Sequence, residues 1–257
     1  MNYPVPDYLL PYVLTGTVAT ATVVLFVLHR TLKLAGWPAR DRQHTDWSGA
    51  LLLGAWYFAA LLPSWFGFYR GTLSRAPTIQ YGVLIPIVVG VALFWRWRAL
   101  RRVIEAIPQE WIVSVQVYRA LGLIFLVLYA GGHLPGEFAW PAGAGDALVG
   151  LLAPAVAIAY AHRSRNAAGL VRTWNLFGIA DLIVAVATGL LTSPSRLQML
   201  ALGAPNELIS AFPLVMVPVF LVPLSVLLHL ASLQKLRSTE TRQRVPPPFT
   251  QATGVNR

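Results

Sequence analysis

Residues 112–131, IVSVQVYRALGLIFLVLYAG, form a mostly apolar stretch that contains a single charged residue, Arg119. At 1.5 Å per residue, a helix of this length reaches about 30 Å, the thickness of the hydrocarbon core of a bilayer. The stretch therefore predicts a membrane-spanning helix that carries a charge away from both of its ends.

Six other runs have the same character, and the seven lie at about 8–29, 48–68, 79–95, 112–131, 141–161, 174–191 and 208–231. The chain as a whole is 56% hydrophobic and 12% charged, with a mean hydropathy of +0.59, which is too apolar for an ordinary soluble domain. We expect an all-α integral membrane protein with one domain of seven transmembrane helices, residues 1–233. Its expected location is the plasma membrane, in a bacterium the inner membrane.

The Lys and Arg residues predict how the chain is threaded. The first, third and fifth loops hold four, four and three of them and the tail five, whereas the second loop holds two and the sixth one. Because cytoplasmic loops are enriched in Lys and Arg, this asymmetry predicts an N-terminus outside and a C-terminus in the cytoplasm. The first run has no positive residues before it, so we expect it to be retained as a helix.

The net charge of +10 is therefore interpreted as a topology signal and a contact with anionic lipid headgroups, not as a nucleic-acid surface. A nucleic-acid partner would need a basic soluble domain, and no loop is long enough to form one. The last segment, residues 234–257, is polar, basic and proline-containing, and we expect a disordered cytoplasmic tail.

Several kinds of chemistry lack their sequence signatures. The chain has no Cys, which excludes disulfides, thiolate nucleophiles and Cys-ligated metals. The His-Glu-x-x-His, Gly-x-Ser-x-Gly and Walker A patterns are also absent. These absences favour a non-enzymatic protein, and we predict no metal site.

Arg119 is the most informative residue. It lies eight residues past Trp111, or about 12 Å into the membrane, and Asp181 lies seven residues past Trp174 on a helix of the same direction. Opposite charges at matched depth predict an ion pair, with Gln116 one turn below Arg119 as an additional hydrogen-bonding group. A charge so deep marks either a binding site or a structural pin between helices, and both interpretations stay open.

Asp146 is expected near the outer mouth of the fifth run. It either caps that helix or guards the entrance of a site formed by Arg119, Asp181 and Gln116.

Three prolines, Pro213, Pro218 and Pro223, interrupt the last apolar run, AFPLVMVPVFLVPLSV at 211–226. Each proline leaves the carbonyl four residues earlier without its intrahelical partner, and such carbonyls cannot face lipid. We therefore expect a bent or broken seventh helix, which is either satisfied by its neighbours or lines a cavity as in many transporters.

His29, His162 and His229 are expected near the cytoplasmic ends of their runs. A pair of them would suit a b-type haem, but histidines at a membrane boundary mostly extend to the interface, so no cofactor is predicted.

The leading functional hypothesis is a small transporter or ligand-binding, permease-like protein with a polar site in mid-membrane and an unknown small-molecule or ion substrate. One alternative is a non-catalytic membrane scaffold or assembly subunit whose buried charges are structural. A second alternative is a membrane redox or enzyme subunit that uses the boundary histidines.

Overall fold

The computed structural model describes residues 5–74 and 76–244, and over these residues the chain is helical with no strand. The helices are α1 (Leu9–Leu34), α2 (Ala39–Trp65), α3 (Ile79–Arg96), α4 (Arg98–Ala106), α5 (Gln109–Val115), α6 (Leu123–Ala130), α7 (Gly136–Ala161), α8 (Ala167–Thr192) and α9 (Val222–Arg244). Three short irregular segments join them: the 3₁₀ segments η1 (Gln116–Gly122) and η2 (Leu208–Ser210) and the π segment η3 (Val217–Leu221).

Seven of these helical segments are long and apolar enough to cross a membrane, as the sequence predicts. Helices α1, α2, α3, α7 and α8 each form one such span. The fourth span, Gln109–Ala130, combines α5, η1 and α6, and the seventh runs from Val217 to Thr241.

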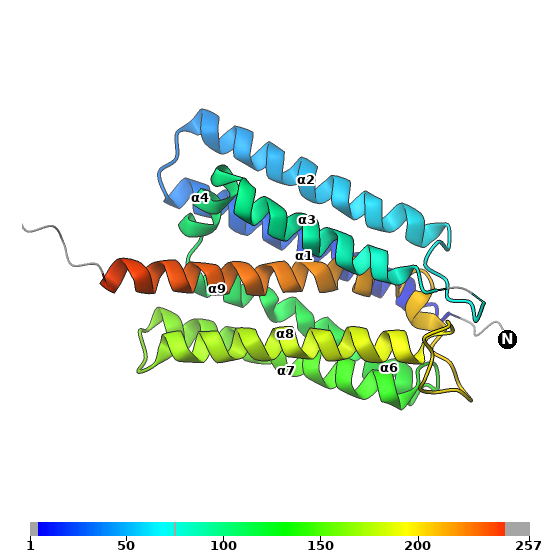
Figure 1. Cartoon of the computed structure of the whole chain (residues 1–257). Coiled ribbons are helices and arrows are strands. Elements are labelled where there is room, and N and C mark those ends of the chain that lie inside the picture. Colours follow the sequence, from blue (N-terminus) through cyan, green and yellow to red (C-terminus); the bar gives the residue numbers. More distant parts are fainter. Residues whose placement is uncertain (1–4, 75, 245–257) are drawn as a thin grey trace, which may run out of the picture.

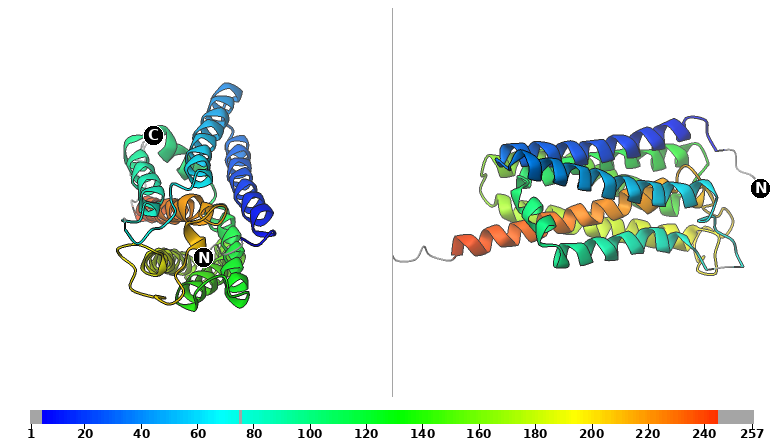
Figure 2. Two further views of the ribbon diagram at one scale, coloured as in Figure 1. Left: turned by 90° about the vertical axis from the view of Figure 1, so that its right-hand side faces the viewer. Right: turned by 90° about the horizontal axis from the view of Figure 1, so that it is seen from above.

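Helix α9 lies at the centre of the bundle. It runs between α1, α2 and α3 on one side and α5 to α8 on the other (Figures 1 and 2) and contacts α3, α5 and α8. Burial differs between the two sides. In an 18-residue apolar window of each span, half of the residues are buried in the fourth, fifth and seventh spans and 28% in the sixth, against 22%, 17% and 11% in the first three. The tightly packed core is therefore built by the later spans, and α1 to α3 leave most of their apolar surface open.

The helix that contains Arg119 changes its winding midway through the span. Residues 116–122 are wound as a 3₁₀ helix, which has three residues per turn and a longer rise than the α-helix. In the middle of a helix such a segment often marks strain or a functional hinge.

The seventh span begins later than the predicted residue 208. Residues 208–210 form the short turn η2, and a continuous helix begins only with η3 at Val217. Pro213 lies in the turns before η3, Pro218 is its second residue and Pro223 is the second residue of α9. The predicted break is therefore present, and it occurs at the start of the span, where each proline lacks the N–H group that an α-helical hydrogen bond needs.

Part of the predicted disordered tail is helical. Helix α9 continues to Arg244, so residues 234–244 extend the seventh span instead of leaving it, and residues 245–257 lie outside the described part of the chain. Leu236 is buried in the core, and Arg172 of α8 binds both carboxylate oxygens of Glu240 at 2.6 and 2.8 Å. These contacts hold the helix beyond the apolar run.

Helix α7 approaches η1 so closely that only glycine fits at position 150. A Cβ atom built there would lie 2.3 Å from the backbone nitrogen of Ala120 and 3.0 Å from the carbonyl carbon of Arg119. Backbone atoms cannot rotate away, so a larger residue must separate the two helices.

We expect Gly150→Ala to lower the free energy of unfolding by about 1–3 kcal/mol, because overpacking displaces η1 from α7. The measurement is thermal or denaturant unfolding in a mild detergent. Gly54→Ala in α2 is the matched control, since a Cβ atom there meets nothing within 4 Å, and its stability should be unchanged or slightly raised. Equal effects of the two substitutions would contradict the close approach.

Candidate functional site

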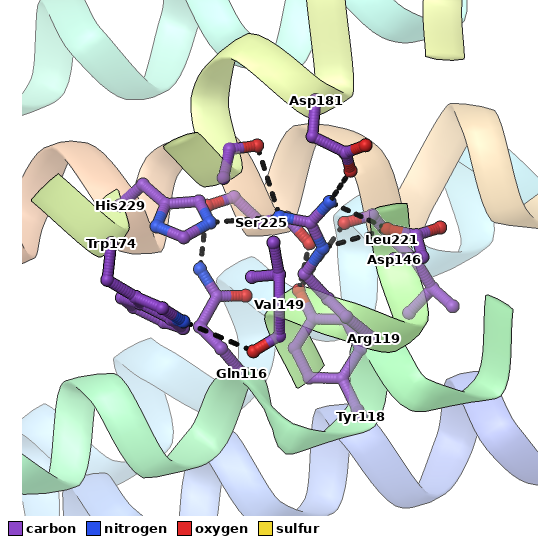
Figure 3. A network of polar contacts seen from close by, with 11 residues as sticks. Gln116, Tyr118, Arg119, Asp146, Val149, Trp174, Asp181, Leu221, Ser225 and His229 are labelled. Carbon is purple, nitrogen blue, oxygen red and sulfur yellow. Dashed lines mark hydrogen bonds and ion pairs between the residues drawn. The ribbon is translucent and has the colours of Figure 1, made fainter. Parts of the chain in front are cut away.

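A buried polar cluster occupies the middle of the α5–α9 core, with Arg119 at its centre (Figure 3). The Arg119 side chain comes from η1 and is 1% exposed. Its neighbours come from α7, α8 and α9, so the cluster connects all of the later spans.

All three nitrogens of the Arg119 guanidinium donate hydrogen bonds. Nε donates to Oδ1 of Asp146 at 2.8 Å, and Nη2 forms an ion-pair contact with the same oxygen at 2.7 Å. Nη2 also donates to Oδ2 of Asp181, while Nη1 donates to the carbonyl oxygen of Gly178 and to Nε2 of His229, each at 3.1 Å. A guanidinium is an expensive group to bury, and these acceptors take the place of water around it.

The hydrogen bonds assign the tautomer of His229. Because Arg119 can only donate, Nε2 of His229 must accept, and Nδ1 must then carry the proton that it donates to Oδ1 of Asn175 at 2.9 Å. The imidazole is therefore neutral in this arrangement. Its ring lies against Trp174, with the two ring centroids 5.0 Å apart, and Trp174 Nε1 donates to the Val149 carbonyl oxygen.

Two glutamines extend the cluster along the interface between the fourth and seventh spans. Nε2 of Gln109 donates to Oγ of Ser232 at 2.6 Å, and Nε2 of Gln116 donates to the carbonyl oxygen of Ser225 at 3.1 Å. Tyr118 shares a hydrogen bond of 2.6 Å with Oγ of Ser225. The Oε1 atoms of both glutamines are buried and have no partner in the described part of the chain, so two acceptors in this seam remain open.

The cluster is enclosed by glycines from three helices. A Cβ atom at Gly122 would lie 2.4 Å from that of Asp146, and one at Gly145 would collide with the carboxylate of Asp181. At Gly178 it would lie 2.4 Å from Nε2 of His229. Their absent side chains let the charged groups meet in the interior.

Two small cavities adjoin the cluster, with volumes of about 30 and 50 Å³. Asp146 lines both, whereas Arg119 lines only the smaller one. The remaining walls are mostly apolar, with Phe125 and Phe138 in the larger cavity. Each cavity exceeds the 10–15 Å³ or so that one water molecule needs. Among Arg119, Asp146 and Asp181, only Asp146 therefore borders both cavities.

Of the four predicted site residues, the structure brings Arg119, Asp146 and Asp181 into direct contact and places Gln116 in the same cluster. Arg119 and Asp181 form the expected ion pair. Gln116 belongs to the cluster, but it bonds to Ser225 and not to Arg119. Whether these residues bind a ligand stays a prediction.

The predicted position of Asp146 at the outer mouth is wrong. Helix α7 begins at Gly136 instead of Pro141, so Asp146 lies ten residues inside it, 8% exposed and bound to Arg119. It is therefore a second partner of the arginine and neither a cap nor an entrance residue.

The three histidines do not share one environment. His29 bonds to Asp46 at 2.8 Å, His162 follows the end of α7, and His229 is fully buried in the cluster instead of lying at the boundary. Both ring nitrogens of His229 are engaged, so it offers no free lone pair to a haem iron in this arrangement. Across residues 5–74 and 76–244, no group of three or more His, Asp or Glu side chains is placed to hold a metal ion.

Sequence reasoning missed His229, Asn175 and Ser232 as members of the cluster. A periodic signal marks them: residues 175, 178 and 181 recur every three positions on α8, and residues 225, 229 and 232 lie at i, i+4 and i+7 on α9. Each set therefore lies along one face of its helix, within an apolar part of the sequence.

We expect Arg119→Gln to lower the free energy of unfolding by about 3–5 kcal/mol, because it leaves two buried carboxylates without their counter-charge. Arg172→Gln is the control, since its ion pair with Glu240 is half exposed and should change stability by about 1 kcal/mol or less. Unfolding of both variants in the same detergent measures the difference. A loss no larger at Arg119 than at Arg172 would argue against a central role for the cluster.

Comparison with known proteins identifies a family but no characterised relative. No curated protein and no solved structure matches the chain. The family model described as a domain of unknown function (DUF8737) matches residues 76–237, which run from just before α3 into α9 and include every residue of the polar cluster. The match covers more than half of the chain, and the protein therefore belongs to the DUF8737 family.

Proposed function

We propose that this protein is a small multi-pass transporter of the plasma membrane, in which Arg119, Asp146 and Asp181 form a proton-binding centre. The observation that carries the proposal is that two buried carboxylates share one guanidinium.

The charges of the cluster do not balance. With both carboxylates ionised and His229 neutral, one positive group faces two negative ones. The second oxygen of each carboxylate receives no hydrogen bond from the described residues. An excess buried charge is costly, and a bound proton or small cation removes that cost. We choose the proton because one carboxylate oxygen without a hydrogen bond can bind it with no further ligand.

The surrounding backbone supports movement at this point. The 3₁₀ segment η1 carries Arg119, and the π segment η3 begins the span that carries His229. Irregular helical segments of both kinds are frequent at functional sites and hinges. Transporters also commonly place their sites beside broken helices near the middle of the bilayer. Protonation of Asp146 or Asp181 would weaken its ion pair with Arg119. The weaker ion pair would shift η1 and η3 between two conformations, and this conformational change would carry a small solute across the membrane.

A specific observation favours the scaffold alternative as the second candidate. All three nitrogens of Arg119 donate hydrogen bonds to groups of the protein, which is the arrangement expected of a structural pin. In that case the cluster would fix the helices and bind nothing.

The experiment uses the protein reconstituted in proteoliposomes on a solid-supported membrane, where a pH step and then a panel of sugars, amino acids and organic ions are applied. We expect a pH-step charge displacement in the wild type that is lost in Asp181→Asn, and a solute-induced current from at least one compound. Asp41→Asn, at an exposed carboxylate of α2, is the control and should behave as the wild type.

The response of the wild type separates the candidates, and the triple variant Arg119→Met, Asp146→Leu, Asp181→Leu is its matched silent form, because it removes all three charges together and leaves none unpaired. Transport predicts a folded but electrically silent protein. The scaffold predicts silence in the wild type as well, with a triple variant that unfolds at a similar temperature.

We also propose the orientation that the loop charges favour, with the N-terminus outside and the C-terminus in the cytoplasm. Because the chain has no Cys, single cysteines report it directly. In intact cells a membrane-impermeant maleimide should label Met199→Cys, in the exposed connection before α9, and should label Arg165→Cys, between α7 and α8, only after permeabilisation. The reverse pattern would overturn this orientation.

A further inference from the structure

A large groove lies at the end of the bundle opposite the connection between α8 and η2, with a volume of about 700 Å³. Its walls come from the last turns of α3, from Glu105 of α4 and from the second half of α9, and Figure 1 shows how these three helices are arranged. The groove is separate from the Arg119 cluster and shares no residue with the cavities there.

The inner part of the groove is apolar and its outer part is polar. Val91 and Phe94 of α3 face Leu230 and Leu233 of α9. Further along α9 the wall changes to polar side chains, Gln234, Arg237, Ser238 and Thr241. This order of an apolar slot followed by a polar rim matches an acyl chain joined to a headgroup.

The charged groups that the structure places at the polar end are two bases and one acid. Arg237 is exposed and forms no hydrogen bond or ion pair with the described residues. The acid in the wall is Glu105, whose backbone carbonyl oxygen accepts a hydrogen bond from Nζ of Lys235 at 2.6 Å. Arg98 and Arg102 are exposed on helix α4, outside the wall. This end of the groove is thus more basic than acidic.

Helix α4 has the form of an interfacial helix. Its nine residues bury Val103 and Ile104 and direct Arg98 and Arg102 outward. Trp95 and Trp97, 75% and 42% exposed, stand at the junction of α3 and α4. Short basic amphipathic helices flanked by tryptophan lie at the boundary between headgroups and acyl chains.

We propose that this groove is a binding site for a phospholipid with an acidic headgroup. One acyl chain lies between Phe94 and Leu233, and the phosphate meets the guanidinium of Arg237. Arginine suits this role because its fork of N–H groups bonds two phosphate oxygens at once. The inference rests on the proposed membrane insertion with this end at the cytoplasmic face, but not on transport.

The test is native mass spectrometry of the full chain in mild detergent, titrated with phosphatidylglycerol or phosphatidylcholine of identical acyl chains. We expect the wild type to retain phosphatidylglycerol preferentially and Arg237→Ala to weaken that retention about fivefold, as the loss of one basic contact implies. Arg165→Ala, at an exposed arginine between α7 and α8, is the control and should match the wild type.

Other outcomes overturn the proposal. Equal retention of the two lipids would mean that the headgroup is not selected, and equal losses in Arg237→Ala and Arg165→Ala would mean diffuse attraction without a site. Displacement of the lipid by millimolar inorganic phosphate would show an anion site with no role for the acyl chain. Arg237→Lys should restore part of the binding, which separates a lost charge from a misfolded variant.

Discussion

The burial of one arginine governs the rest of this structure. A guanidinium withdrawn from water needs hydrogen-bond acceptors for its N–H groups, and the three nitrogens of Arg119 obtain them from two carboxylates, a carbonyl oxygen and an imidazole on three other helices. The four later spans must therefore keep a common depth and rotation about this point. Helices α1 to α3, which contribute nothing to it, are also the least buried.

Satisfying the arginine shapes the backbone around it. The acceptors reach the guanidinium only because glycines at 122, 145, 150 and 178 let the helices approach more closely than any side chain allows. The need to bring Arg119 to its acceptors is also compatible with the 3₁₀ winding of η1. A 3₁₀ helix has a longer rise per residue than an α-helix and so changes where each side chain lies along the span. Charge, packing and irregular winding thus occur at one level of the bundle, and the proposed proton site occupies that level too.

Much of the fold could be predicted from the sequence, because seven apolar runs directly specify seven spans. The Arg119–Asp181 contact could be predicted as well, because the two residues lie at similar depths. Arg119 is eight residues past Trp111 and Asp181 is seven residues past Trp174, and each tryptophan marks the start of its apolar run. The error at Asp146 came from taking Pro141 as the first residue of α7, when proline is also tolerated further along the first turns. The sequence places His229 near the membrane boundary because the polar residues from 234 onward indicate a tail. In the structure α9 continues to Arg244 and packs against α8, so His229 lies well inside the helix. Such errors arise where tertiary contacts, which a single chain does not display, decide where a helix begins and ends.

The glycine at position 150 has a consequence for how this family can vary. Its neighbour is the backbone of Ala120 and Arg119, so no change of side chain on η1 makes room for a larger residue there. A substitution on η1 consequently cannot compensate for a larger residue at position 150. We expect variation among members to concentrate on the surfaces that face lipid, and the arginine and its enclosing glycines to be inherited as a unit.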